Sequence, residues 1–171
     1  KPMGINANAG SKLYISPEPV DQDSINAMTD AEALTFFDGI EDWVEVEEVE
    51  DLGTIGDTAE AITFTSVGNS RVRKLKGPKD AGTQSLVVGR DPLDEGQEEL
   101  ITAEGTSFNY AFRLVLSDAP TPDYDSSELF YAALVMSKST NLGNVSNVHR
   151  RNFDLGINTG VYEKRAAETT P

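Results

Sequence analysis

The 171-residue sequence contains no cysteine and only one histidine, His149. The absence of cysteine excludes disulfides, thiol nucleophiles, iron–sulfur clusters and cysteine-ligated zinc, and a single histidine excludes any site that requires two imidazoles. No apolar run approaches the length of about 18 residues that crosses a membrane, and residues Lys1–Gly10 lack the apolar centre of a signal peptide. The sequence therefore predicts a soluble protein without a membrane partner.

Positive charge is also scarce. There are 14 Lys and Arg residues against 29 Asp and Glu residues, which gives a net charge of −15 at pH 7. A protein that holds nucleic acid tightly needs clustered cations to neutralise phosphates, so this class of protein is disfavoured. The hydrophobic fraction of 38% is typical of a globular chain, and the length allows one domain or two small ones.

Alternation of apolar and polar residues is the main pattern in the sequence, and it predicts strands. In the clearest case, Phe108–Ser117, five apolar residues share one face: Phe108, Tyr110, Phe112, Leu114 and Leu116. Leu129–Ser139 is apolar on both faces, which is typical of a central strand covered on both sides. Further strands are expected at Lys12–Ser16, Trp43–Val49, Glu60–Val67, Arg71–Lys76, Thr83–Arg90, Asn147–Asn158 and Gly160–Lys164.

Helical patterns are fewer. Thr29 and Glu32 have capping-box spacing before an apolar segment, Gly39 stands where that helix would end, and Ser24–Met28 is expected to extend it backwards. A second helix is expected at Asp94–Ala103, because its first turn is acidic and therefore favourable to the helix dipole.

Together these patterns predict a mainly β fold, a sandwich or barrel with one flanking helix and one inserted helix within residues 21–40. We expect a single barrel-like domain over residues 1–165, in which residues 51–80 form an extended loop or hairpin. A polar, mobile tail is expected at residues 166–171.

No catalytic or cofactor-binding motif is present in the sequence. His149 is expected on the apolar face of a strand as a structural residue, with no nucleophile beside it. The Asp21–Asp23 and Asp123–Asp125 segments contain possible calcium ligands but lack EF-hand spacing. Neither a phosphate-binding P-loop nor a dinucleotide-binding glycine motif occurs. We therefore expect a protein that is not an enzyme and needs no metal or cofactor.

Two segments concentrate charge. Glu41–Asp51 carries seven acids in eleven residues, and Arg71–Lys79 carries five of the 14 cations in nine residues. Such runs are usually solvated strand faces. The alternative is that the acidic segment of one chain meets the basic segment of another, because like charges along a strand repel and opposite charges guide association.

The order and spacing of the segments between Trp43 and Leu100 resemble the major tail tube proteins of long-tailed bacteriophages and phage-like gene transfer agents. The resemblance extends over most of the chain after residue 10. The matching segments are Lys12–Ser16, Glu48–Asp57 (EVEDLGTIGD), Ile62–Ser66 (ITFTS), Lys74–Thr83 (KLKGPKDAGT), Asp91–Leu100 (DPLDEGQEEL) and Val135–Val148 (VMSKSTNLGNVSNV). Residues 21–40 depart from the family pattern as a helical insertion, which we expect to be an outward-facing decoration.

The resemblance implies a structural virion protein of tail-tube-like fold, without enzymatic activity, that polymerises as stacked rings of six into a hollow tail tube. Its expected partners are further copies of itself, a tape-measure protein, and the tail terminator and distal tail proteins, with DNA only as transient cargo. Its expected location is the virion tail, assembled in the cytoplasm of the host bacterium. An acidic bore would keep passing DNA from adhering.

For such a tube, two sets of residues are expected to make contacts. Stacking between rings is assigned to the basic segment of the hairpin around Gly68-Asn69 and to acids elsewhere: Arg71, Arg73, Lys74, Lys76 and Lys79 with Glu48, Glu50, Asp51, Asp94 and Glu95. The lumen is assigned to four residues that face away from apolar strand faces: Glu45, Glu47, Asn152 and Asp154. An alternative is that these four residues lie at contacts between subunits.

A second class of function stays open, a non-catalytic carbohydrate- or ligand-binding β-sandwich. Such a module needs exposed aromatic residues on one face, whereas Trp43 is the only tryptophan and the five tyrosines are scattered. A metal-assisted hydrolase is disfavoured further by the lack of histidines.

Overall fold

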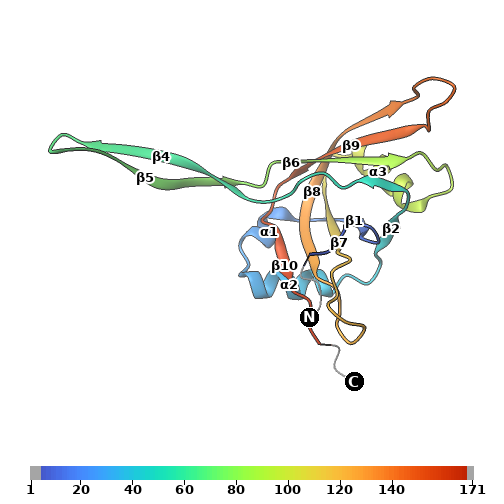
Figure 1. Cartoon of the computed structure of the whole chain (residues 1–171), viewed down its shortest axis with the longest axis horizontal. Coiled ribbons are helices and arrows are strands. Elements are labelled where there is room, and N and C mark those ends of the chain that lie inside the picture. Colours follow the sequence, from blue (N-terminus) through green and yellow to red (C-terminus); the bar gives the residue numbers. More distant parts are fainter. Residues whose placement is uncertain (1–4, 169–171) are drawn as a thin grey trace.

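The computed structural model describes residues 5–168. It is mostly β with few helices, as the sequence predicted (Figure 1). The elements in chain order are β1 (Lys12–Val20), α1 (Gln22–Asn26), α2 (Asp30–Asp38), β2 (Val44–Val46), β3 (Val49–Asp51), β4 (Thr58–Ser66), β5 (Asn69–Asp80), β6 (Thr83–Gly89), α3 (Glu95–Glu104), β7 (Asn109–Val115), β8 (Glu128–Asn141), β9 (Arg150–Ile157) and β10 (Tyr162–Lys164).

The body of the protein is an eight-stranded antiparallel sheet. Its strand order is β2-β1-β7-β8-β9-β6-β3, and β10 pairs with β8. Strands β2 and β3 lie at opposite ends of this order, yet only Glu47 and Glu48 connect them. The two ends of the sheet are therefore held close together, and the sheet curls into an incomplete barrel.

This link corrects one prediction from the sequence, a single strand over Trp43–Val49. The chain leaves one edge of the sheet at Val46 and joins the other edge at Val49. Glu48 takes a positive φ of 55°, and its carbonyl accepts a hydrogen bond from the Gly89 amide at 2.8 Å. A residue other than glycine rarely adopts this conformation, so the surrounding contacts hold it there.

The main core fills the inside of the barrel. Leu13, Phe112, Leu86 and Phe153 come from four different strands and are fully buried there. Strand β8 contributes alternate residues to two cores. Tyr131, Ala133 and Val135 face the interior, whereas Phe130 and Ala132 face outward into a second cluster. The prediction that this strand is covered on both sides is confirmed for Leu129–Val135, whereas Met136, Lys138 and Ser139 are exposed.

Helices α1 and α2 cover the outer face of the sheet. Ile25, Ala33 and Phe37 are fully buried, and the Phe37 ring stacks on Phe130 with a centroid distance of 5.4 Å. Residues 21–40 are therefore a layer packed on the outer face of the sheet, and their role as an outward-facing decoration stays a prediction. The predicted capping box is confirmed, since the Glu32 carboxylate accepts from the Thr29 amide at 2.8 Å.

Four smaller expectations need correction. Ser24–Met28 does not extend α2 backwards; α1 is a separate helix whose N-cap is Asp21. His149 is exposed and precedes β9, and Phe108 is 61% exposed and precedes β7, so neither lies on a buried strand face. Residues 166–168 of the expected mobile tail are paired, because Ala167 accepts from the Asp125 amide at 2.9 Å. Residues 169–171 lie outside the described part of the chain.

Helix α3 supplies the remaining part of the interior core. Its predicted extent, Asp94–Ala103, agrees with the observed helix, for which Asp94 is the N-cap. Leu100 and Ala103 are fully buried against the strands. At Gly96 the helix lies so close to β2 that a Cβ atom would be 2.1 Å from the Glu45 carbonyl oxygen.

Truncation of Leu100 tests this packing. We expect Leu100→Ala to lower the free energy of unfolding by about 2–5 kcal/mol, because it leaves a cavity in a dense core. The measurement is urea denaturation, with Thr102→Ala as the control on the exposed side of the same helix, where the expected change is within about 0.5 kcal/mol. A loss below about 0.5 kcal/mol for Leu100→Ala would show that the helix does not pack through this residue.

Candidate assembly surfaces

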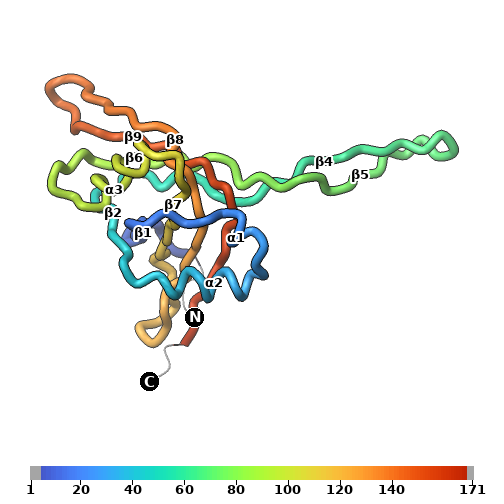
Figure 2. Tube along the Cα trace, turned by 180° about the vertical axis from the view of Figure 1, so that it is seen from behind, coloured from blue at the N-terminus to red at the C-terminus, as the bar shows by residue number. Residues whose placement is uncertain are grey.

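Strands β4 and β5 form a separate two-stranded sheet that projects from the body (Figures 1 and 2). Their pairing runs from Thr58 opposite Asp80 to Ser66 opposite Asn69, so the hairpin lies within the predicted segment 51–80, and its turn, Val67-Gly68, is one residue before the expected Gly68-Asn69 pair. No residue of the hairpin is buried. An isolated hairpin is marginally stable in water, so this segment gains from a partner.

The pairing register gives the hairpin two different faces. Residues directly opposite each other point to the same side of a ribbon, so Ile62, Leu75 and Phe64 share one side with Arg73. These three apolar side chains are 49%, 61% and 56% exposed, and we call this side the apolar face. The opposite side carries two lysines, and we call it the basic face. Its residues are Ala61, Thr63, Thr65, Val72, Lys74 and Lys76. An interpretation of the segment by charge alone missed the apolar face, although the alternation of Ile62 and Phe64 with polar residues indicates one.

The five cations expected to mediate stacking have no ion-pair partner within residues 5–168. All lie on the exposed strand β5: Arg71, Arg73, Lys74, Lys76 and Lys79. The ion pairs in this part of the chain use other cations: Lys12, Arg113, Lys138, Arg150 and Lys164. The positive charge of the hairpin is therefore not neutralised by direct contacts within its own subunit.

Among the acids expected to meet these cations, Asp94 is not free. It is 5% exposed, and its carboxylate accepts from the Gly96 amide at 2.9 Å and from the Glu47 amide at 3.0 Å. This geometry caps α3 and fixes the link between β2 and β3. The N-cap role is predicted by the position of an acid just before a helix, whereas no sequence pattern predicts the contact with Glu47, which lies 47 residues away.

The other four acids on that list are exposed, and two of them are engaged. Arg150 of β9 forms an ion pair with Glu50 and lowers the pKa of its carboxyl. Asp51 accepts from the Gly53 amide at 2.8 Å. Glu48 lies at the link between the sheet edges and Glu95 in the first turn of α3, and both face solvent.

The residues expected in the lumen fall into two groups. Asn152 and Asp154 lie on the outer face of β9, and the Asp154 carboxylate accepts from the hydroxyls of Ser85 and Ser137, each at 2.8 Å. These residues form a patch of small polar side chains across β6, β9 and β8, here called the polar stripe. Glu45 lies on β2 and pairs with Lys12, and Glu47 lies in the link between β2 and β3.

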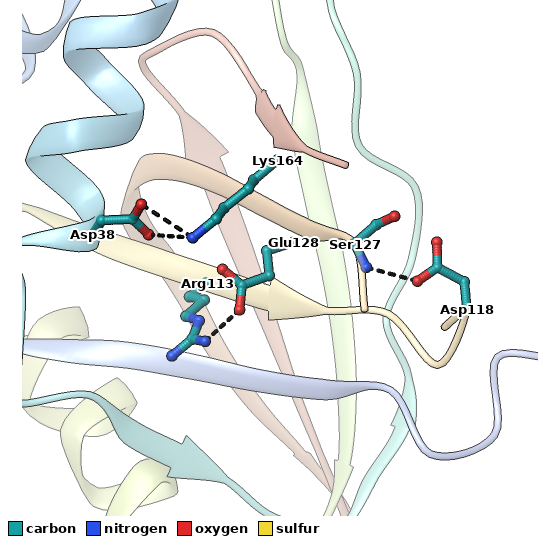
Figure 3. A network of polar contacts seen from close by, with 6 residues as sticks. All are labelled: Asp38, Arg113, Asp118, Ser127, Glu128 and Lys164. Atoms are coloured by element: carbon teal, nitrogen blue, oxygen red, sulfur yellow. Dashed lines mark hydrogen bonds and ion pairs between the residues drawn. The ribbon is translucent and has the colours of Figure 1, made fainter. Parts of the chain in front are cut away.

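Polar contacts fasten the outer helical layer to the sheet (Figure 3). The Lys164 ammonium of β10 donates to both oxygens of Asp38 on α2, at 3.0 and 3.1 Å. Arg113 of β7 pairs with Glu128 of β8 beside it. The Lys164–Asp38 contact and the stacking of Phe37 on Phe130 hold α2 on the sheet, whereas the Arg113–Glu128 pair joins two strands within it.

The root of the hairpin is fixed from inside the core. Gln84 is fully buried on β6, and its side-chain amide donates to the Leu52 carbonyl at 2.7 Å. The Tyr131 hydroxyl donates to the other end of the same amide, and burial raises the pKa of this tyrosine. Gly53 follows with φ of 66°, where a Cβ atom would lie 2.4 Å from the Ser85 carbonyl oxygen. The chain therefore leaves the body in a defined direction.

Other kinds of site find little support in the part of the chain that the structure describes. No group of three or more His, Asp or Glu residues there could hold a metal ion. No helix in residues 5–168 is long and apolar enough to cross a membrane. The large exposed aromatic side chains, Phe64, Phe108 and Tyr124, lie on separate segments and form no common platform for a sugar.

Comparison with known proteins identifies the fold. No protein-family model and no curated protein sequence matches the chain. Solved structures match over nearly the whole length. A chain of the six-fold symmetrised baseplate of the anti-feeding prophage matches with a TM-score of 0.65 at 10% identity, covering 95% of this chain and 98% of that one. A chain of the sheath/tube terminator of an extracellular contractile injection system, PVC, matches with a TM-score of 0.63 at 10% identity, covering 94% and 96%.

A third match is the tail tube of SPP1, with a TM-score of 0.57 at 13% identity, covering 93% of this chain and 78% of that one. At such identities the likeness establishes the fold. The chain has the tail tube fold, as the resemblance in its sequence predicted.

Substitution of Gln84 tests the anchoring of the hairpin root. Gln84→Leu leaves the Leu52 carbonyl and the Tyr131 hydroxyl without a partner, and we expect a loss of about 1–3 kcal/mol of stability. Amide hydrogen exchange at residues 53–57 should accelerate. Tyr131→Phe is the matched control, because it removes one hydrogen bond and keeps the contact from Gln84 to Leu52. Equal exchange rates in the two variants would contradict the role of Gln84.

Proposed function

We propose that this protein is the structural subunit of a tail tube, and that six copies form a ring and the rings stack into a hollow tube. The observation that carries the proposal is the match of about nine-tenths of the chain or more to subunits of tube-related assemblies. The six-fold symmetry of the prophage baseplate supports six subunits per ring. The protein acts in a virion or virion-like tail, assembled in the bacterial cytoplasm, and has no catalytic role.

Stacking is the proposed role of the β4–β5 hairpin. Its exposed faces and unneutralised cations favour association with an acidic surface, and every other copy carries the same net charge of −15. A single exposed ion pair contributes only about 0–1 kcal/mol. Because the contact repeats around a ring, these small contributions add and fix the register of one ring on the next.

The polar stripe is the proposed lumen surface. Its side chains are short, and the only charge among Ser85, Ser137, Asn152 and Asp154 is negative. A surface of this kind offers DNA few cations to bind, so the nucleic acid passes as cargo without adhering. Contacts with a tape-measure protein inside the tube, and with terminator and distal tail proteins at its ends, belong to the same proposal.

Charge reversal on the hairpin tests the proposal. Electron microscopy of the purified protein should show rings or tubes, and raised salt should slow their growth because it screens the hairpin cations. We expect Arg73→Glu with Lys74→Glu to leave the subunit folded and to abolish tubes. Arg90→Glu with Arg165→Glu is the charge-matched control, since both residues are exposed cations outside the hairpin.

Normal tubes from the hairpin variant would exclude the hairpin as the stacking contact. Small particles that bind a glycan array would favour the carbohydrate-binding alternative.

Limited proteolysis gives an independent test. Trypsin should cleave free subunits first at the exposed cations of β5, between Arg71 and Lys79, because a lone hairpin opens readily. Assembled tubes should be cleaved at least ten-fold more slowly there. Cleavage after Arg113 in the half-buried strand β7 serves as the reference within the same chain. The same rate of cleavage in both forms would contradict a role for the hairpin in assembly.

A further inference from the structure

The outer side of the α1–α2 layer carries an apolar groove with an acidic rim. The groove runs between β1 and α2, and its apolar lining residues are Pro17, Val20, Phe36 and Ile40. Glu18, Glu41 and Asp42 lie along it. A second shallow hollow, between α1 and α2, shares Phe36 and adds Met28 and Ala31. The two hollows form one surface centred on Phe36, which we call the α2 groove.

The hairpin has the complementary chemistry. Its apolar face presents Ile62, Phe64 and Leu75 to solvent, and Arg73 lies on the same face opposite Phe64. The groove offers apolar area with carboxylates at its edge, and the hairpin offers apolar area with a cation beside it. Apolar contact and charge complementarity therefore favour the same pairing.

A hairpin that lies in this groove must come from another subunit. In both views the hairpin points away from the body, and its tip lies far from α2 (Figures 1 and 2). Donor and acceptor are also different surfaces of the molecule. A contact between two different surfaces leaves a free donor and a free acceptor after each addition, so it propagates into a ring or an open stack.

We propose that the β4–β5 hairpin of one subunit lies in the α2 groove of a second copy, with its apolar face inward and Arg73 toward Glu41 and Asp42. This inference rests on the proposed function and names the surface that receives the hairpin. It also assigns a role to the helical layer of residues 21–40. One side of this layer is buried on the sheet, and its other side faces the neighbouring subunit.

The other exposed apolar segment is a poorer acceptor. Leu142, Val145 and Val148 are 59%, 106% and 65% exposed in the connection between β8 and β9. Residues 142–148 contain no charged side chain, so this tip offers apolar contact without a carboxylate for Arg73. It serves as the competing acceptor in the test.

Site-specific crosslinking tests the proposal directly, because the chain has no cysteine of its own. Two proteins with one cysteine each, Phe64→Cys and Ile40→Cys, are mixed, assembled and treated with a short bis-maleimide. We expect crosslinked dimer at a yield at least ten-fold above that of Val72→Cys with Ile40→Cys, because Val72 lies on the basic face. Asp42→Cys at the exposed rim is a second acceptor, which keeps the test valid if Ile40→Cys destabilises the subunit.

The outcomes separate the inference from the function on which it rests. Tubes that form while Phe64→Cys links to Val145→Cys, and to neither groove cysteine, would overturn the groove assignment and leave the tube subunit intact. Equal yields from Phe64→Cys and Val72→Cys would overturn it as well. Subunits that stay monomeric in sedimentation at high concentration would overturn both the proposed function and the hairpin contact.

Discussion

The link between β2 and β3 holds the two ends of the sheet together, and most of the structure depends on it. The Glu47 amide donates to the Asp94 carboxylate, which also caps α3, and the Glu48 carbonyl accepts from β6. One corner therefore fixes both sheet edges and the start of the helix that fills the core. The segment that leads to the hairpin follows β3 directly, so the direction of the hairpin is set from the same corner.

Local patterns predicted the elements that local rules control. The alternation of Tyr110, Phe112 and Leu114, the two buried faces of Leu129–Val135 and the capping box at Thr29 all depend on side chains close in sequence, and each is present in the structure. The start of α3 at Asp94 belongs to the same class, since an acid before a helix caps it.

Features that depend on distant contacts could not be predicted in this way. The break at Glu48 requires a positive φ that only the closed sheet imposes. The burial of Phe37 depends on Phe130, which lies more than 90 residues further along the chain, so the sequence of residues 21–40 did not predict a layer packed on the sheet. The two faces of the hairpin depend on pairing register, and charge counting alone concealed them. For the candidate surfaces, residue type correctly indicated that the cations of β5 are exposed. It also assigned Asp94 to a contact with another subunit, whereas the Asp94 carboxylate caps α3 and binds the Glu47 amide within its own chain.

The anchored root makes the hairpin a lever. Strand β5 has 12 residues, which at about 3.3 Å per residue gives an arm of about 40 Å. A rotation of the body by one degree would then move the tip by about 0.7 Å, a large fraction of the tolerance of a packed apolar contact. An assembly held at such tips would resist small twists of each subunit and pass them on to the next. The contact from buried Gln84 to Leu52 lies at the base of this arm, so the residues that set its direction differ from the exposed residues that would make the contact between subunits.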